Sequence, residues 1–453
     1  MTEAEAEIRP VFKAPDYLRA AKAAAAWIER VEVRTGQGVY WPELPDENAD
    51  EGGEAINFYR GSSGKIFFFS QLYAATNEEI FLQRAVEGAS YVMANFEKRI
   101  LLSRLPGLPN SEWAFYSGAC GVAFAMMELL KLVKNAEIET FVRRILNKIA
   151  VAAVETEFGL VWCGQSCINY DSGTILFLLY ASRYLRDENL LELAVRAGEP
   201  LLRLGRRVPE GGERFDGFNP EYYGFDKSVH WANFEMGTAG IAYTLLLLYE
   251  ASGRDDFLRA AKHGAEYVHA VSAVSGDAAL VPYRFPDLKN IFYLGYCHGP
   301  TGTARLYHEL YNVTGERVYE EFRDMLVRGL LRAGAPEIHS DGYWNVYSQC
   351  CGTSGMVGLF LGLWAGIGKQ EYLDIANRAG RHILGAASVA DGLALKWYQA
   401  HERVDPSRLR AHTGYIDGAA GIGMALLQIH QANSGVLKTA RLPDDPFPAS
   451  QLF

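Results

Sequence analysis

Gly295-Tyr-Cys-His-Gly-Pro-Thr-Gly302 recurs in altered form as Ser348-Gln-Cys-Cys-Gly-Thr-Ser-Gly355. Thiolates and imidazoles are the preferred ligands of Zn²⁺ in proteins. Three buried structural cysteines are the simpler interpretation, because free cysteine is among the most buried residue types. An adjacent cysteine pair, with a third cysteine at the equivalent point of a repeat, favours a zinc site instead. The residues that alignment on the glycines brings to equivalent positions are Cys297 with Cys350, and His298 with Cys351.

The same pattern recurs at seven places along the chain. Each unit has an aromatic or small residue, the sequence Gly-x-x-Gly, an apolar run, a polar break and a second helical run. The third unit lacks its first glycine. Successive closing glycines are between 52 residues (121 to 173) and 67 residues (173 to 240) apart, which fits one helical hairpin with its loop. The closing glycines are Gly64, Gly121, Gly173, Gly240, Gly302, Gly355 and Gly421.

The two runs of each unit differ in character. The first is nearly all apolar, as in residues 241–249, and a helix that is apolar on all sides is buried on all sides. The second is amphipathic, as in residues 256–268, so one face meets water. Seven inner and seven outer helices predict an all-α fold, a closed α/α toroid of seven helical hairpins. An open solenoid is the alternative, but it usually needs distinct capping repeats, and none is clear.

Composition limits the class of protein. The chain has 453 residues, 49% of them hydrophobic, which is ample for a large core. We predict one domain over residues 1–453, with a repeat core at about 17–430 and tails at 1–16 and 435–453. The net charge of −10 argues against nucleic acid as a partner. Without an apolar run of about 18 residues or a signal-peptide core, we expect no transmembrane segment and a cytoplasmic protein with reduced cysteines.

The repeats and the cysteine motifs together resemble the lanthionine synthetase C-like proteins, which include lanthipeptide cyclases. The resemblance runs from about Tyr17 to His430. Tyr296-Cys-His-Gly and Gln349-Cys-Cys-Gly look like the family's Trp-Cys-x-Gly and Cys-His-Gly zinc motifs. The family fold is a seven-fold α/α barrel. By this resemblance Cys297, Cys350 and Cys351 are the zinc ligands, and Cys351 stands where most members carry a histidine.

The chemistry that the resemblance implies is thioether formation. A substrate thiol loses its proton at the zinc and adds to the β-carbon of a dehydroalanine or dehydrobutyrine, and a general acid protonates the product. The implied substrate is a dehydrated precursor peptide or a small thiol, and the implied partner enzyme is a dehydratase.

The acid–base half of the site departs from the family pattern. Active cyclases carry a histidine before the first glycine of the fourth unit, where this chain has Met236. The third unit should carry an acidic residue. The replacements that we predict as catalytic residues are Glu235, His230, Asp171 and Asp417, with His298 next to the zinc loop or facing the substrate. For each of the first four, a solvated loop residue is the alternative.

Three functions therefore compete. The first is a zinc-dependent cyclase. The second is a zinc protein of the same family that binds thiols or peptides without cyclase activity, which Met236 favours. The third is a sugar-acting α/α-barrel enzyme, which would need two carboxylates across the mouth of the barrel and would leave the aligned cysteines without a role.

Overall fold

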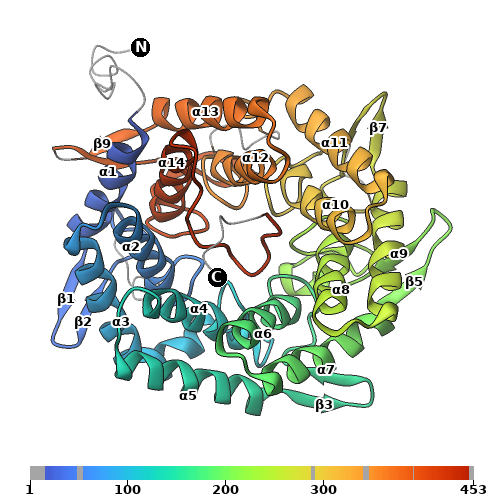
Figure 1. The fold of residues 1–453 in the computed structure, drawn as a ribbon, viewed down its shortest axis with the longest axis horizontal. Helices are drawn as coiled ribbons and strands as arrows, with labels where there is room; N and C mark the ends of the chain where they lie inside the picture. The colour runs from blue at the N-terminus through green and yellow to red at the C-terminus, as the bar shows by residue number, and fades with distance from the viewer. Residues whose placement is uncertain (1–15, 48–54, 287–290, 340–345, 391, 448–453) are drawn as a thin grey trace.

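The structure is a computed structural model that describes residues 16–47, 55–286, 291–339, 346–390 and 392–447. Among these residues the helices form two concentric rings (Figure 1). The inner helices are α2 (Ser62–Thr76), α4 (Ala119–Leu130), α6 (Asp171–Leu185), α8 (Thr238–Ser252), α10 (Pro300–Thr314), α12 (Thr353–Ile367) and α14 (Ala419–Asn433). The outer helices are α1 (Tyr17–Arg30), α3 (Glu79–Arg99), α5 (Ala136–Ala152), α7 (Glu188–Leu204), α9 (Asp255–Val271), α11 (Arg317–Arg332) and α13 (Gln370–Gly385). The predicted α/α toroid of seven hairpins is confirmed.

The closing glycine of each unit lets the inner helices approach one another. In the fourth unit a Cβ on Gly240 would lie 1.9 Å from the carbonyl oxygen of Phe234 and 2.6 Å from Cγ1 of Ile168 in the third unit. Both separations are far below van der Waals contact, so only glycine fits there. A Cβ on Gly64 of the first unit would meet Tyr415 Cβ of the seventh at 2.6 Å. The same packing therefore closes the ring.

Backbone hydrogen bonds also join successive units at the mouth of the ring. The amide of Glu235 donates to the carbonyl oxygen of Cys297 at 2.9 Å, and the amide of Cys350 donates to that of Ile416 at 3.1 Å. The amide of Ile416 donates in turn to Tyr59 at 3.0 Å, from the last unit to the first. These bonds fix the residues before each inner helix relative to those of the next unit.

Short antiparallel hairpins follow five of the outer helices. In the first, Arg34 pairs with Val39, Thr35 pairs with Gly38, and the turn is at residues 36–37. Gly38 has φ +125°, and a Cβ there would lie 2.3 Å from the carbonyl oxygen of Glu87 in α3, so the position requires glycine. A sixth hairpin joins residues 399–402 to 405–410. The hairpins are β1 (Val33–Thr35) with β2 (Gly38–Tyr40), β3 (Val154–Thr156) with β4 (Gly159–Val161), β5 (Gly205–Arg207) with β6 (Glu213–Phe215), β7 (Ala273–Ser275) with β8 (Ala278–Leu280), β9 (Ser388–Ala390) with β10 (Ala394–Lys396), and β11 (Gln399–Glu402) with β12 (Asp405–Arg410).

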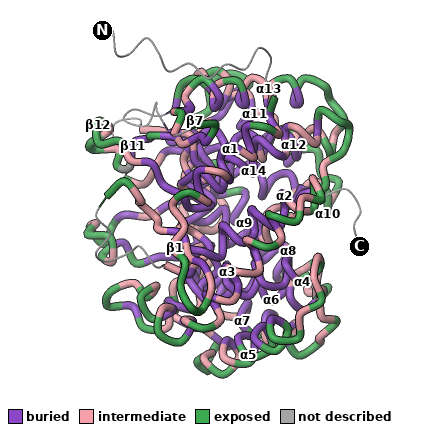
Figure 2. The backbone as a smooth tube through the Cα atoms, turned by 90° about the vertical axis from the view of Figure 1, so that its left-hand side faces the viewer, coloured by how far each residue is buried: buried purple, intermediate pink, exposed green. Residues whose placement is uncertain are grey.

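Burial follows the two rings. Buried residues occupy the interior and exposed residues gather on the outer helices and hairpins (Figure 2). The inner helix α8 is buried over almost its whole length, whereas α9 buries one face. This matches the apolar and amphipathic runs of the sequence. No helix in the described part of the chain has both the length and the apolar character needed to cross a membrane.

The C-terminal segment does not lie on the outside of the ring. It leaves α14 and turns into the centre of the toroid (Figure 1). Residues 1–15 and 448–453, which we predicted as parts of the two tails, lie outside the described residues. That residues 1–453 form one domain stays a prediction.

Candidate metal centre

A cavity of about 380 Å³ lies where the units meet at the mouth of the toroid. Most of its lining residues stand at the two positions before the first glycine of a unit, or before Tyr170 in the third unit, which lacks that glycine. These positions are brought together because the backbone hydrogen bonds of the mouth link successive units at these residues. The lining residues are Asn57, Tyr59, Arg60, Ser117, Asn169, Tyr223, Glu235, Met236 and His298.

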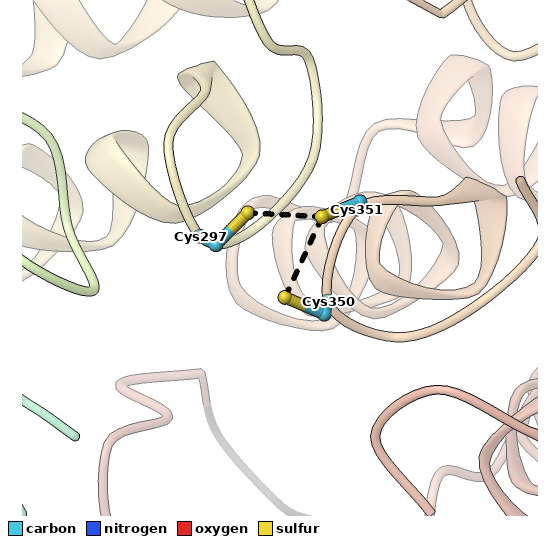
Figure 3. A group of neighbouring side chains, drawn as sticks. All are labelled: Cys297, Cys350 and Cys351. Atoms are coloured by element: carbon cyan, nitrogen blue, oxygen red, sulfur yellow. Dashed lines mark hydrogen bonds between the residues drawn. The ribbon is translucent and has the colours of Figure 1, made fainter. Parts of the chain in front are cut away.

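The three predicted zinc ligands converge beside this cavity (Figure 3). The Sγ atoms of Cys297 and Cys351 are 3.2 Å apart, and those of Cys351 and Cys350 are 3.6 Å apart. All three Sγ atoms lie within 4.8 Å of one another. The amide of Cys297 donates to the carbonyl oxygen of Cys350 at 3.2 Å, so the two ligand loops are hydrogen-bonded directly.

The three thiols fit a zinc ion. With Zn–S bonds of about 2.3 Å, the sulfurs of a tetrahedral site lie roughly 3.8 Å apart. The observed 3.2 and 3.6 Å are shorter than that edge length by roughly 0.6 and 0.2 Å. Hydrogen bonds with Cys297 and Cys350 lower the pKa of Cys351 to about 5, and burial raises the pKa of Cys297. The cluster therefore keeps one thiolate in a buried place, which attracts a cation.

Tyr59 is a neighbour of the cysteines that the sequence analysis did not single out. Its hydroxyl hydrogen-bonds to the Cys350 side chain. Burial, followed by the charge of Cys350, raises the pKa of Tyr59 well above its usual range, so the hydroxyl stays protonated and can donate. The sequence could have indicated this neighbour, because alignment on the glycines places Tyr59 of the first unit at the same position as Cys350 of the sixth.

Glu235 and His298 complete the wall next to Cys297. A carboxylate oxygen of Glu235 and a ring nitrogen of His298 lie within 4.8 Å of the Cys297 sulfur. Burial, and secondly the charge of Cys350, raises the pKa of Glu235 well above its usual range, while a hydrogen bond with Asn169 opposes the shift. Burial therefore favours the protonated form of Glu235, which lines the cavity.

The orientation of His298 is fixed by Asn233. The Asn233 amide nitrogen donates to backbone carbonyls, including that of Tyr283 at 3.0 Å. Its Oδ1 is then the acceptor for Nδ1–H of His298, at 3.0 Å. Burial lowers the pKa of His298 to about 3, so the ring is neutral and Nε2 keeps its lone pair. His298 therefore acts as an acceptor beside the cysteines.

Asp417 lies across the mouth in an ion-pair cluster. Arg60 contacts Asp417 through Nε and Glu43 through Nη1, the latter at 3.2 Å. Nδ1 of His412 is 3.3 Å from Glu43 and 3.8 Å from Asp417. Glu43, His412 and Asp417 are close enough to hold a metal ion, but the guanidinium already supplies the positive charge. Arg60 lines the cavity, whereas Asp417 is not among the lining residues.

The other two predicted residues lie elsewhere. Asp171 is the first residue of α6, and its carboxylate accepts the amides of residues 162–164 at 3.0 to 3.3 Å and the thiol of Cys163 at 3.3 Å. It orders this loop and is not among the residues that line the cavity. His230 lines a separate cavity of about 420 Å³, stacks on Phe285 and lies 3.4 Å from Arg214.

Met236, which precedes the first glycine of the fourth unit, lines the cavity. Its sulfur lies 3.9 Å from the Cys167 sulfur and 3.5 Å from Nδ2 of Asn169. The residue is 3% exposed. The thioether thus fills this position with a group that cannot transfer a proton.

The fold and the site define an α/α toroid with a cluster of three thiols at one mouth. A model of the family described as "Lanthionine synthetase C-like protein" matches residues 172–366, which include the fourth, fifth and sixth glycine motifs. Over these residues the chain is similar to the lanthionine synthetase C-like family.

Solved structures support the same fold. Nisin cyclase is 14% identical, with a TM-score of 0.63 over 91% of this chain and 93% of that chain. The Lin0763 protein from Listeria innocua is 13% identical, with a TM-score of 0.51 over 93% of this chain and 99% of that chain. At these identities, the likeness concerns the arrangement of the helices.

Proposed function

We propose that this protein is a zinc-dependent enzyme that adds a cysteine thiol to a dehydroalanine or dehydrobutyrine and so forms a thioether ring in a modified peptide. The observation that carries the proposal is the convergence of three thiols, within 4.8 Å of one another, beside a cavity that also holds the carboxyl group of Glu235. A dehydrated precursor peptide is the proposed substrate, and a dehydratase is the proposed partner enzyme. The match of residues 172–366 to the model of the lanthionine synthetase C-like family supports this choice of chemistry.

The proposed ligands are Cys297, Cys350 and Cys351. A bound zinc ion would supply the ionisation of a substrate thiol near neutral pH. The hydrogen bond from Tyr59 to Cys350 fixes one ligand from the first unit. Ordering of ligands by hydrogen-bonded neighbours is a general feature of zinc sites.

Glu235 is the proposed general acid. In the addition, a carbon–sulfur bond forms at the β-carbon, the carbon–carbon double bond becomes single, and negative charge moves to the α-carbon and its carbonyl oxygen. The carboxyl group of Glu235 lies beside Cys297, where it can deliver a proton to the α-carbon. The proton lost by the substrate thiol restores the carboxyl group through solvent, so the net reaction is an addition without a co-reactant.

Tyr59 and Arg60 are the proposed donors to the developing negative charge. Both line the cavity, and both carry N–H or O–H groups. Burial and the charge of Cys350 keep the Tyr59 hydroxyl protonated, and Arg60 is charged at every relevant pH. Fixed donors aimed at developing charge lower the barrier because they need no reorganisation during the reaction.

The test is cyclisation of a peptide that contains one cysteine and one dehydroalanine, followed by loss of free thiol and by mass spectrometry. We expect the parent to cyclise it, and Glu235→Gln to be slower by about 10²–10⁴-fold with unchanged zinc content. His230→Gln, in the separate cavity, is the matched control and should keep the parent rate. If Glu235→Gln matches the parent, the assignment of the acid is wrong.

A second function is favoured by Met236. Because its thioether occupies the cavity wall where an acid would stand, the protein is alternatively a zinc module that binds thiols or peptides. A parent that holds zinc and binds peptide thiols, but never cyclises, would favour this second function. Met236→His distinguishes the two, since a gain of cyclisation would show that only a proton donor was missing.

A sugar-acting enzyme finds less support. Such chemistry uses two carboxylates that flank the scissile bond. Among the described residues that line the cavity, Glu235 is the one carboxylate. Asp417, the other predicted acidic residue near the mouth, is paired with Arg60 and is not among the residues that line the cavity.

A further inference from the structure

The segment after α14 lies in the central channel of the toroid, which the inner helices surround (Figure 1). The amide of Ala440 donates to the side chain of Gln71 in α2 at 2.8 Å. Phe447 packs against Gly362 of α12 so closely that a Cβ on that glycine would lie 2.1 Å from the ring. The segment thus contacts helices from separate units of the ring. It is packed into the channel, where it can act on the residues around it.

Asp444 is the polar centre of this segment. It is 2% exposed. Its Oδ2 accepts hydrogen bonds from the hydroxyls of Tyr116, at 2.7 Å, and of Tyr296. Arg305 of α10 donates to its backbone oxygen at 3.1 Å and lies 3.7 Å from its Oδ1. A buried carboxylate with this many donors is held in one position.

Tyr296 connects this carboxylate to the metal centre, because it directly precedes Cys297. The amides of Tyr296 and Cys297 both donate to the carbonyl oxygen of Cys350, at 2.8 and 3.2 Å. The side chain of Tyr296 is fixed by Asp444 and by Arg305, whose guanidinium lies 4.7 Å from the ring centroid. The backbone that carries one ligand is therefore held from inside the channel.

Tyr116 provides an internal comparison. Its hydroxyl lies 3.2 Å from that of Tyr296 and donates to the same oxygen of Asp444. Tyr116 belongs to the second unit and adjoins no cysteine of the metal centre. The two tyrosines therefore share one partner but differ in whether they adjoin a ligand.

We propose that the segment from Gly435 to Phe447 is an internal plug of the toroid, and that its Asp444 is a positioning residue that holds Cys297 in register with Cys350 and Cys351 through Tyr296. This rests on the metal-binding part of the proposed function and not on the cyclisation. Residues that hydrogen-bond the ligands of a metal site typically change its affinity by about 10–100-fold when they are lost. Asp444 contacts the residue before a ligand and not the ligand itself, so the lower part of that range applies.

The experiment measures zinc affinity by competition with a chromophoric chelator, together with the visible spectrum of the Co²⁺-substituted protein. The variants are Asp444→Asn, Tyr296→Phe, their double variant, and Tyr116→Phe as the matched control. We expect about a 10-fold loss of zinc affinity and an altered Co²⁺ spectrum in the first two. The zinc affinity of the double variant should be no lower than that of the more affected single variant, because both changes break the same connection. Tyr116→Phe removes one donor to Asp444 but keeps its bond with Tyr296, so it should lower the unfolding temperature and change the zinc affinity less than either of the first two variants.

Several results would overturn the proposal. If Asp444→Asn and Tyr296→Phe unfold at lower temperature but keep the parent's zinc affinity and Co²⁺ spectrum, the plug has only a structural role. If the losses add in the double variant, Asp444 does not act through Tyr296. If the parent itself binds no zinc, the proposed function fails and this inference fails with it, a result that differs plainly from the other two.

Discussion

The two sides of the mouth both carry groups that can be negatively charged, but they differ in where the balancing positive charge comes from. On one side, the first and seventh units present Arg60 and Asp417, and the guanidinium lies between Asp417 and Glu43. On the other side, the fifth and sixth units present three cysteines, with Cys297 and Cys350 at equivalent positions and Cys351 at the position of His298. The first side has its cation built into the chain. Among the described residues, the hydrogen-bonding partners of the three thiols include no cationic side chain, so we expect their balancing cation to be a metal ion from solution.

The largest effect that we predict would remove this difference on the cysteine side. Cys350→Ala should lose most of the bound zinc, because two thiols and no replacement ligand make a weak site. Elemental analysis of the purified variant measures this. Cys120→Ala, a buried cysteine of the second unit outside the cluster, is the control and should keep its zinc. Full zinc retention in Cys350→Ala would contradict the ligand assignment.

A second prediction concerns Lys65, the buried lysine behind the Arg60 side. Its ammonium group donates to the carbonyl oxygens of Arg60 at 2.7 Å and of Trp41 at 3.1 Å. Burial lowers its pKa to about 7 from its ordinary 10.5. Between these values the unfolded chain binds more protons than the native one, so stability rises with pH. From pH 7 to 9.5 the gain from this group is on the order of 3 kcal/mol.

Chemical denaturation at several pH values tests this. Lys65→Met should flatten the rise in the free energy of unfolding over this range, because the substitution removes the group that titrates. Lys134→Met, on an exposed residue, should keep the parent slope. An unchanged slope in Lys65→Met would mean that the ammonium group is well stabilised where it lies.

The smallest predicted effect removes the built-in cation. Arg60→Met leaves Glu43 and Asp417 without their guanidinium and should cost about 1–3 kcal/mol at pH 7, less than for a fully buried pair because 37% of the Arg60 side chain is exposed. Although burial acts to raise it, the pKa of Glu43 is lowered by the hydrogen bond with His412 and the charge of Arg60.

That direction sets the pH dependence of the loss. The stabilisation from Glu43 is fully present above its ordinary pKa and disappears as pH falls through the lowered value. The difference between Arg60→Met and the parent should therefore shrink in acid, as measured by thermal unfolding at pH 3 and pH 7. Arg408→Met, on the exposed strand β12, is the control. A difference that is constant with pH would show that Arg60 contributes by packing alone.

The toroid could be predicted from the sequence because each unit repeats the same local pattern, a glycine motif followed by an apolar run and an amphipathic run. The glycine pairs predicted the inner helices, and alignment on those glycines predicted that Cys297, Cys350 and Cys351 meet. The same alignment, applied to the first unit, places Tyr59 and Arg60 at the mouth, so these two could have been found.

Other features depend on contacts between distant parts of the chain. His230 lies in a different cavity because the long connection between β6 and α8 carries it there, and no periodic pattern governs such a connection. The position of Asp171 follows from its hydrogen bonds to residues 162–164. Nothing in the composition of the C-terminal segment indicates that Asp444 meets tyrosines of the second and fifth units.

X-ray absorption spectroscopy at the zinc edge, on protein purified without added metal, tests the central claim most directly. The account predicts one zinc per chain whose spectrum contains three sulfur ligands at about 2.3 Å and one lighter ligand. In Cys351→His the spectrum should change to two sulfurs and two lighter ligands, with zinc retained. A metal shell made of nitrogen and oxygen alone, or a folded protein that takes up no zinc, would contradict it.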